Sequence, residues 1–401
     1  MKHTASQMTS RLYYTDAYST AFDGRITELS ADGRRVYLDQ SAFYPTSGGQ
    51  PFDLGSLDGT PVTDVVDEDD RVAHVLAEPL TNRSVGDAVR GAIDWRRRFD
   101  HMQQHTGQHL LSAVFEDLFG YATASVHFGA DRSSLDLDIG AIGTKQLGDA
   151  ERRANEIVWE NRPVTVTFED FASATGLRKP PPRTGTLRIV SIDAVDRSAC
   201  GGTHVRATGE IGAIILRGTE RVRKLTRVEF LCGARVIRQA RADFEALSAI
   251  ALAMKASMLE APALVVSQGE QLREAATTRK RLDTELAEFQ ARALYDATAP
   301  TVGGVRVATV RREGGSLEDI RPLAQAFVAR PRGVFVATVA SPATVLIAAS
   351  DDSGVDAGAV LKAALAAVGG RGGGSPRLAQ GTGPNAETLD AVVSAVNAAV
   401  T

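Results

Sequence analysis

The stretch SACGGTH, residues 198–204, holds one of the two cysteines of this 401-residue chain and one of its seven histidines. Cys200 and His204 are separated by three residues, and two of these are glycines, which allow a tight turn. A thiolate and an imidazole brought together by such a turn are ligands that Zn²⁺ prefers. The other interpretation is a buried cysteine that packs as a small apolar residue. A metal site would need a second pair of ligands elsewhere in the chain.

That second pair is present in HTGQH, residues 105–109. Residues four apart on a helix lie on one face, with Cβ atoms about 5–6 Å apart, so both histidines of this stretch can reach one ion. His101, four residues before His105, could compete as a ligand. It lies on the same helix face but one turn farther from His109. We therefore predict one Zn²⁺ per chain. Its predicted ligands are His105, His109, Cys200 and His204.

The histidine pair differs from the H-E-x-x-H helix of metalloproteases. The residues between the two histidines are Thr106, Gly107 and Gln108, so the glutamate that acts as general base in that motif is missing. A peptidase is therefore not expected. A zinc ion could polarise a substrate carbonyl, lower the pKa of a bound water or, with four protein ligands, act by positioning. The sequence leaves these roles open.

Composition and charge indicate an ordinary globular protein, with 43% hydrophobic and 23% charged residues. The net charge of −4 argues against a wholly basic nucleic-acid-binding protein. Basic segments at 94–100, 177–183, 217–227 and 278–281 still leave a polyanionic partner open. Two cysteines cannot form a disulfide framework, and no signal peptide or long apolar run is present. We expect a cytoplasmic protein that does not enter a membrane.

The length and the changing periodicity predict an α+β protein of several domains. Short β-forming runs between turn residues predict a small β-barrel over 8–92. From Asp94 the apolar period becomes helical, and Gly120 follows the end of the predicted helix. Further strands and a second helix complete a predicted α+β, zinc-containing domain over 93–233.

The rest of the chain is predicted to form two further parts. Apolar residues spaced three to four apart over 234–298, interrupted once at Pro262, predict two long helices in an antiparallel hairpin. Buried strands alternate with helices over 299–401, which predicts an α/β domain. Between its last helices, GGRGGGSPRLAQGTG (369–383) predicts a Gly-rich loop that allows backbone N–H groups to approach an anion. A flexible connection is the other interpretation of this loop.

Both ligand pairs resemble the H-x₃-H and C-x₃-H pairs of the alanyl-tRNA synthetase editing domain, and more closely those of free-standing AlaX-type editing proteins. FYPTSGGQPFDLG (43–55) resembles the Gly-rich motif of the barrel that precedes that domain. Residues 178–212 resemble the second half of the domain, and 369–381 resemble the Gly-rich signature of the DHH-associated C-terminal domain of alanyl-tRNA synthetases. The resemblance covers essentially the whole chain in the family's domain order and implies the long AlaX form.

The resemblance implies hydrolysis of the ester that joins a wrong amino acid to tRNA(Ala). Serine is the main expected substrate and glycine the second candidate. A pocket that accepts alanine cannot reject these amino acids well by size, because such differences are worth about 1–3 kcal/mol. A second site that hydrolyses the wrong ester would remove the serine and glycine that the first pocket accepts. No carboxylate or histidine base stands out. We therefore expect zinc and local donors to orient the ester and a water, with a 2′ or 3′ hydroxyl of the tRNA assisting.

By the same resemblance, the four metal ligands line a substrate pocket. The pocket candidates are Gln108, Thr123, Ser125 and His127. Gln108 replaces the threonine that is common before the second histidine in synthetase editing sites. Contacts to the acceptor stem and CCA end of tRNA(Ala) are expected from residues of the two Gly-rich motifs. These candidates are Thr46, Gln50, Arg371 and Arg377.

Three alternatives accompany this interpretation. A threonyl-type editing module shares both ligand pairs, although the Gly-rich C-terminal region favours the alanyl type. A non-catalytic tRNA-binding protein with a structural zinc would differ in having no hydrolytic activity. A full synthetase is not expected, because no adenylation domain fits ahead of residue 11, so neither ATP binding nor ligation is predicted. A homodimer through the helical hairpin or the C-terminal domain is a further expectation.

Overall fold

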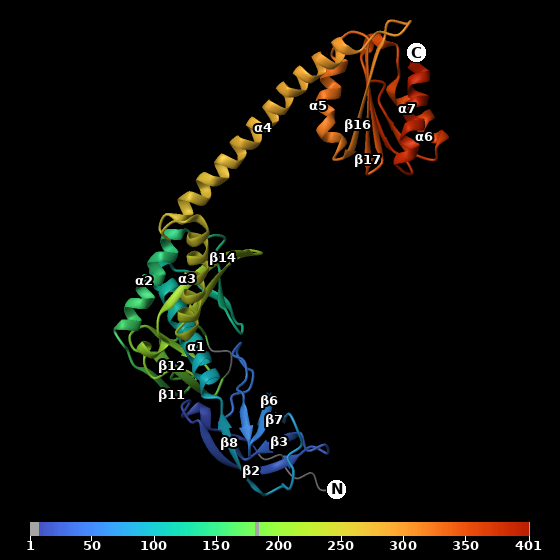
Figure 1. Cartoon of the computed structure of the whole chain (residues 1–401). Coiled ribbons are helices and arrows are strands. Elements are labelled where there is room, and N and C mark those ends of the chain that lie inside the picture. The colour runs from blue at the N-terminus through green and yellow to red at the C-terminus, as the bar shows by residue number, and fades with distance from the viewer. Residues whose placement is uncertain (1–7, 181–183, 401) are drawn as a thin grey trace. The chain divides into compact units, whose positions relative to one another are not determined.

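The computed structural model describes residues 8–180 and 184–400. The chain divides between Ala249 and Ile250 into two compact units (Figure 1). Part of the basic segment 177–183 and the last residue of the predicted domain 299–401 lie outside the described residues. Within the described ranges, no helix has the length and apolar character needed to cross a membrane. The mixed α+β character predicted from the sequence is confirmed.

The first unit begins with a closed barrel in the strand order β2-β3-β7-β6-β5-β8. Its strands are β2 (Ala21–Leu29), β3 (Arg35–Leu38), β5 (Gly55–Leu57), β6 (Thr60–Glu68), β7 (Arg71–Leu76) and β8 (Ala88–Ile93). Along β8 exposed and buried residues alternate, as expected for a strand with one face on a core. A short β1 (Ser10–Arg11) pairs in parallel with β4 (Gln40–Ser41), beside a 3₁₀ turn at Leu12–Tyr14. The connection from β4 to β5 contains most of the Gly-rich stretch 43–55.

Helix α1 (Trp95–Phe119) carries the predicted histidine ligands. Asp94 caps its start by accepting a hydrogen bond from the backbone N–H of Arg97, and Gly120 ends it in the left-handed conformation. Both ends agree with the sequence prediction. Every residue from 101 to 115 is buried. Because this buried stretch includes many polar side chains, they need partners inside the protein.

Two antiparallel sheets pack against α1, one in the order β14-β15-β10-β9 and one in the order β11-β12-β13. Helix α2 (Thr144–Trp159) also packs against α1. The strands, with one 3₁₀ turn, are β9 (Thr123–Phe128), β10 (Ser133–Leu137), β11 (Val164–Asp170), β12 (Thr186–Ile192), β13 (Asp196–Ala199), η2 (Thr208–Ile211), β14 (Ile214–Val222) and β15 (Leu225–Cys232). Apolar side chains of α1, α2 and both sheets form one continuous core.

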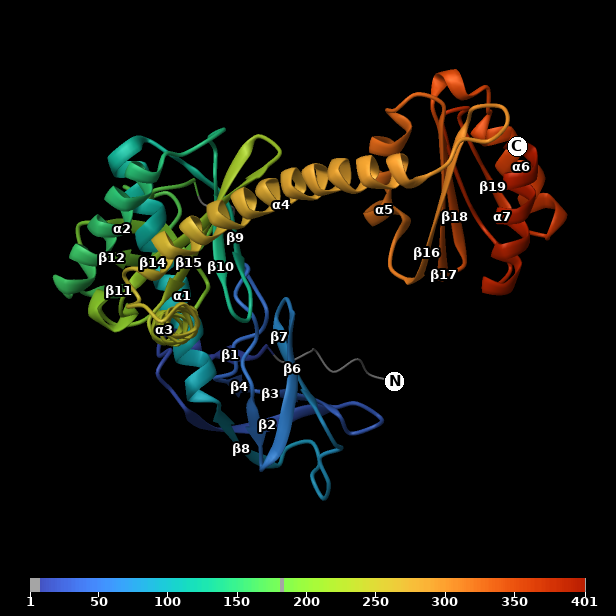
Figure 2. The same ribbon diagram turned by 45° about the horizontal axis from the view of Figure 1, so that its top comes forward.

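The second unit has a five-stranded sheet in the order β16-β17-β18-β20-β19. Its elements are α4 (Ala261–Ala297), β16 (Arg306–Gly314), α5 (Leu317–Val328), β17 (Gly333–Ser341), β18 (Thr344–Ala349), η3 (Asp351–Ser353), α6 (Ala357–Ala367), β19 (Arg371–Gly374), β20 (Leu378–Thr382) and α7 (Ala386–Val400). Strands β16 and β17 are parallel, and the other neighbours are antiparallel. Helix α5 covers one face, and α6 and α7 cover the other (Figures 1 and 2). Both faces of the sheet are therefore buried.

The Gly-rich stretch 369–383 contains a β-hairpin, which corrects the predicted loop. Strands β19 and β20 pair in antiparallel fashion. Helix α6 packs closely on this hairpin: a Cβ added at Gly372 would lie 2.5 Å from Cδ1 of Leu365, and one added at Gly381 would lie 2.2 Å from the same atom. Glycine at these positions makes room for the helix on the strands.

The two long helices predicted over 234–298 are present as α3 (Ala234–Met254) and α4. Helix α3 belongs to the first unit as far as Ala249, and α4 belongs to the second. Several apolar residues of α4 are exposed, including Leu272, Leu282 and Phe289. The antiparallel packing of the two helices stays a prediction.

Candidate metal centre and adjoining pocket

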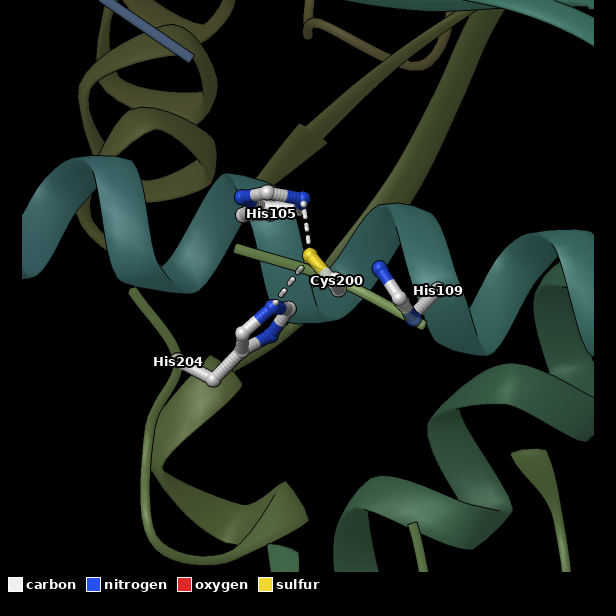
Figure 3. Close-up of side chains that lie close together, drawn as sticks. All are labelled: His105, His109, Cys200 and His204. Carbon is white, nitrogen blue, oxygen red and sulfur yellow. Dashed lines mark hydrogen bonds between the residues drawn. The ribbon is translucent and has the colours of Figure 1, made fainter. Parts of the chain in front are cut away.

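The four residues predicted as zinc ligands lie together (Figure 3). One ligand atom from each of them lies within 4.8 Å of the others. Cys200 Sγ is 3.5 Å from His105 Nε2 and 3.3 Å from His204 Nε2. Ligand atoms around a tetrahedral zinc lie about 3.3–3.8 Å apart, given bonds of about 2.0–2.3 Å. The two sulfur–nitrogen distances fall in this range, and three imidazoles with one thiol are a donor set that suits Zn²⁺.

Two elements supply the ligands, and a glycine lets them meet. One pair lies one turn apart on α1, and the other follows strand β13. A Cβ added at Gly202 would lie 2.2 Å from Cε1 of His105, so the turn after Cys200 passes directly over this imidazole. At Gly107 on the same helix, an added Cβ would lie 2.3 Å from Sγ of Cys232. Cys232 is thus a packing residue between α1 and β15.

Each imidazole is held through Nδ1 by an oxygen of a different residue. The pairs are His105 with Gln50 Oε1 at 2.8 Å, His109 with Asp196 Oδ2 at 2.8 Å, and His204 with Thr106 Oγ1 at 3.1 Å. With Nδ1 engaged, each ring presents Nε2 towards the common centre (Figure 3). Outer partners that fix the orientation of ligand histidines are typical of metal sites.

Charges in the centre favour a thiolate. Burial alone would raise the pKa of the Cys200 thiol, but the imidazoles of His105 and His204 lower that pKa well below its usual value. Burial alone would lower the pKa of His109, but the Asp196 carboxylate and Cys200 raise it to about 9. Because a metal takes the place of the proton on a ligand nitrogen, zinc binding here would release a proton from His109.

A pocket of about 250 Å³ adjoins the metal centre. Residues of α1, β9 and β13, with the segment that precedes β12, form its walls. Among its lining residues are Gln108, His109, Thr123, Ser125, Arg178, Lys179 and Ser198. The pocket therefore combines one predicted metal ligand, three of the four predicted pocket residues and two cationic side chains.

The side chains of Gln108 and Thr123 converge on one serine. Gln108 Nε2 and Thr123 Oγ1 each donate a hydrogen bond to Ser112 Oγ at 2.8 Å. All three residues are buried. This network orders a polar wall of the pocket beside the candidate ligand His109.

Ser125 and His127 contact a second acidic group, Asp136. Ser125 Oγ donates to Asp136 Oδ2 at 2.6 Å, and His127 Nε2 lies 3.0 Å from the same oxygen. The His127 ring is 51% exposed, and Arg227 also contacts it. His127 is not among the residues that line the pocket, so its predicted role there has no support from this geometry.

The predicted tRNA contacts differ in accessibility. Thr46 is exposed, whereas Gln50 is 1% exposed and bonds to His105 and Thr203. Gln50 therefore orients a candidate metal ligand from a buried position, and its predicted contact with tRNA stays a prediction. Arg371 is exposed on β19, and Arg377 is exposed and paired with Asp351. The tRNA contacts of Thr46 and both arginines stay predictions.

Two known domains match parts of the chain. Residues 303–401 match the DHHA1 domain. Residues 187–229, which include Cys200 and His204, match the second additional domain of threonyl and alanyl tRNA synthetases. The matches lie in the second and first unit respectively.

The alanyl-tRNA editing protein AlaX-L of Pyrococcus horikoshii is 30% identical over 388 positions, which cover 93% of this chain and 94% of that protein. The chain belongs to the AlaX-L family. The alanyl-tRNA editing protein Aarsd1-A of Xenopus laevis is 37% identical over 215 positions, which cover 52% of each chain. The alanine–tRNA ligase of Halorubrum lacusprofundi is 32% identical over 96% of this chain but only 43% of the ligase. The chain thus spans less than half the length of that relative.

Sequence reasoning misses several residues of the site in this AlaX-L family member. Asp196 and Ser112 carry no motif, and their roles depend on contacts between distant segments. Arg178 and Lys179 belong to the basic segment 177–183 and to the stretch 178–212, but neither signal places them at the pocket. Lys179 Nζ donates to the backbone carbonyl of Thr123, which places it across the pocket from α1.

Proposed function

We propose that this chain is an aminoacyl-tRNA deacylase that removes wrongly attached serine from tRNA(Ala) in trans. The observation that carries the proposal is the pocket of about 250 Å³ with the candidate ligand His109 in its wall. A substrate ester in this pocket would lie beside the metal centre. Two relatives are named as alanyl-tRNA editing proteins, which supports the same activity. Identity along nearly the whole AlaX-L chain favours the alanyl type over a threonyl-type module.

Serine recognition is proposed to come from the polar wall of the pocket. Gln108 and Thr123 are held in place by Ser112, so their polar groups are already oriented. A buried polar site binds a substrate hydroxyl well and binds the analogue without it poorly, because its own groups then stay unpaired. Serine carries that hydroxyl and alanine does not. Glycine is the second candidate substrate.

Different groups of the chain would have different roles in the reaction. When bound, zinc would polarise the ester carbonyl or a water. Arg178 and Lys179 bring positive charge to the opposite wall, where the negatively charged 3′ end of tRNA would enter. Among the described residues that line the pocket there is no carboxylate to act as base. We therefore assign catalysis to orientation of the ester and a water, with a tRNA hydroxyl as the proposed assistant.

The test is hydrolysis of seryl-tRNA(Ala) and alanyl-tRNA(Ala) by the purified protein. The wild-type chain should hydrolyse the first and spare the second. Cys200→Ala and His109→Ala should abolish hydrolysis, because each removes a metal ligand. Cys232→Ala is the matched control, since it removes the other thiol, which lies in the core between α1 and β15. Full hydrolysis by both ligand variants would refute the proposed role of the metal centre.

The second unit is proposed to bind tRNA, on the basis of its DHHA1 match. The alternative of a non-catalytic protein with a structural zinc does not account for the pocket that adjoins the candidate metal centre. The four predicted domains, 8–92, 93–233, 234–298 and 299–401, stay proposals. Binding at the acceptor stem and CCA end, homodimer formation and a cytoplasmic location are also proposals.

A further inference from the structure

One buried carboxylate contacts both the metal centre and the basic wall of the pocket. The Asp196 side chain, on β13, is 0% exposed. Its Oδ2 lies 2.8 Å from His109 Nδ1, and its Oδ1 accepts a hydrogen bond from Arg178 Nε at 2.6 Å. Ser198 Oγ donates to the same carboxylate at 3.0 Å. A single side chain thus connects helix α1 with the segment that precedes β12.

We propose that Asp196 is a positioning residue with two tasks. The first is to orient His109 for metal binding. The second is to hold Arg178, and with it Lys179, at the pocket. The second task rests on the proposed deacylase function, whereas the first concerns metal binding alone.

The first task follows from the outer partners of the ligand histidines. Gln50 and Thr106 offer neutral oxygens to His105 and His204, whereas Asp196 offers a carboxylate to His109. A carboxylate at Nδ1 increases the electron density at Nε2 and fixes the ring plane, and both effects strengthen the bond to a metal. Removing the charge of Asp196 should therefore weaken zinc binding.

The second task follows from the way the segment before β12 is anchored. The backbone N–H of Arg178 donates to the carbonyl of Arg197 on β13 at 2.8 Å. Its guanidinium contacts Asp196 and Ser198, so the side chain as well as the backbone is fixed to β13. The next residue, Lys179, lines the pocket. Loss of the Arg178 anchor should therefore displace the positive charge that would meet the tRNA 3′ end.

Three single variants of the full-length chain separate the two tasks. Asp196→Asn keeps an acceptor for His109 but removes the charge. Arg178→Gln removes the anchor without touching a metal ligand. Glu169→Gln is the matched control, because Glu169 pairs with Arg197 in the same small sheet but contacts neither ligand nor pocket. Zinc affinity is measured by competition with a chromophoric chelator, the ligand field by the absorption of the Co²⁺-loaded protein, and kcat and KM with seryl-tRNA(Ala).

Asp196→Asn should lower zinc affinity about 10–100-fold, the effect typical of losing such an outer partner. It should also change the Co²⁺ spectrum and raise KM. Arg178→Gln should raise KM and leave zinc affinity and the Co²⁺ spectrum unchanged, and Glu169→Gln should change none of these. If circular dichroism shows Asp196→Asn to be unfolded, Asp196→Glu replaces it in the experiment. This variant keeps the carboxylate charge, but its side chain is one methylene longer, so its zinc affinity should also fall.

Zinc affinity of the Asp196 variant equal to that of the wild type would overturn the first task. An unchanged KM for Arg178→Gln would overturn the second. If the wild-type chain does not hydrolyse seryl-tRNA(Ala), the proposed function fails and the second task fails with it. The zinc titration and the Co²⁺ spectrum still decide the first task, because neither needs enzymatic activity.

Discussion

Gln50 joins three distant parts of the first unit at the metal centre. Its Oε1 accepts from the backbone N–H of Thr203 at 3.1 Å and lies 2.8 Å from His105 Nδ1, and its Nε2 donates to Thr203 Oγ1 at 2.8 Å. The barrel loop, α1 and the turn after Cys200 therefore meet at one amide. Because all these groups are buried, each would cost about 1–3 kcal/mol if left without a partner. A loop of the barrel thus supplies an outer partner of the candidate metal site.

Asp136 gives a prediction about pH at the scale of one residue. The hydrogen bond from Arg227 lowers the pKa of this carboxyl, burial opposes the shift, and Ser125 and His127 add to the lowering. The folded-state pKa therefore lies below the unfolded value of about 3.9. The carboxylate stabilises the fold fully above that value, and the stabilisation is lost as pH falls through the folded-state pKa.

Asp136→Asn should therefore lower the free energy of unfolding by about 1–3 kcal/mol at pH 7, because it removes hydrogen bonds to a charged group. The difference from wild type should be the same at pH 5 and should narrow below about pH 4. Urea unfolding over this pH range measures it. Asp149→Asn removes a partly exposed carboxylate on α2 that pairs only with the exposed side chains of Lys145 and Arg152, and it should change stability by less than about 1 kcal/mol. A difference that grows as pH falls would contradict the prediction.

At the scale of elements, one buried ion pair fixes the start of α1 to the barrel. Arg98 and Asp53 are both 0% exposed. Arg98 also donates to the carbonyls of Ala17 at 2.8 Å and Ala42 at 2.5 Å, and Asp53 accepts from the backbone N–H of Tyr44 at 2.7 Å. These bonds hold both ends of the loop that carries Gln50. The ion pair therefore sets the distance between the barrel and the histidines of α1.

Arg98→Met should destabilise the protein by about 3–5 kcal/mol, because it leaves the Asp53 carboxylate buried without its partner. Urea unfolding of the zinc-loaded protein measures the loss. Arg96→Met is the control on the same helix, since Arg96 is exposed, and it should cost less than about 0.5 kcal/mol. Equal stability of the two variants would show that the buried pair does not hold α1 to the barrel.

Elements with local signals could be predicted from the sequence, and features that depend on distant contacts could not. The Asp94 cap, the Gly120 stop and the helical period predict α1, and the spacing of each ligand pair is a local pattern. The hairpin at 369–383 is completed by the pairing of β20 with β18 and by α6, whose Leu365 packs on its glycines. Asp196 likewise gains its role only because β13 lies beside α1. Neither contact has a counterpart in the local sequence.

At the scale of the whole molecule, the metal centre and its pocket lie entirely in the first unit. The core residues of the barrel and of the sheets around α1 also belong to this unit. The second unit has its own cores on both faces of its sheet. We therefore expect a chain that ends at Met254 to fold and to bind one zinc ion.

Removing the residues after Met254 should weaken binding to full-length tRNA(Ala) by about 100-fold or more, since linking two binding sites strengthens binding by about that factor. The rate on a minimal seryl acceptor stem should change little, because the pocket is intact. Filter binding and single-turnover hydrolysis measure the two quantities. An equal loss on both substrates would indicate that the second unit supports folding of the first.

The central claim is that the metal centre makes this chain a serine-selective deacylase. The most direct test removes the metal with a chelator and follows hydrolysis of seryl-tRNA(Ala) and alanyl-tRNA(Ala) before and after zinc is returned. Hydrolysis of the seryl ester should disappear in the metal-free protein and return with one zinc per chain, while the alanyl ester stays intact. Undiminished hydrolysis by the metal-free protein, or equal hydrolysis of both esters by the zinc-loaded protein, would contradict the account.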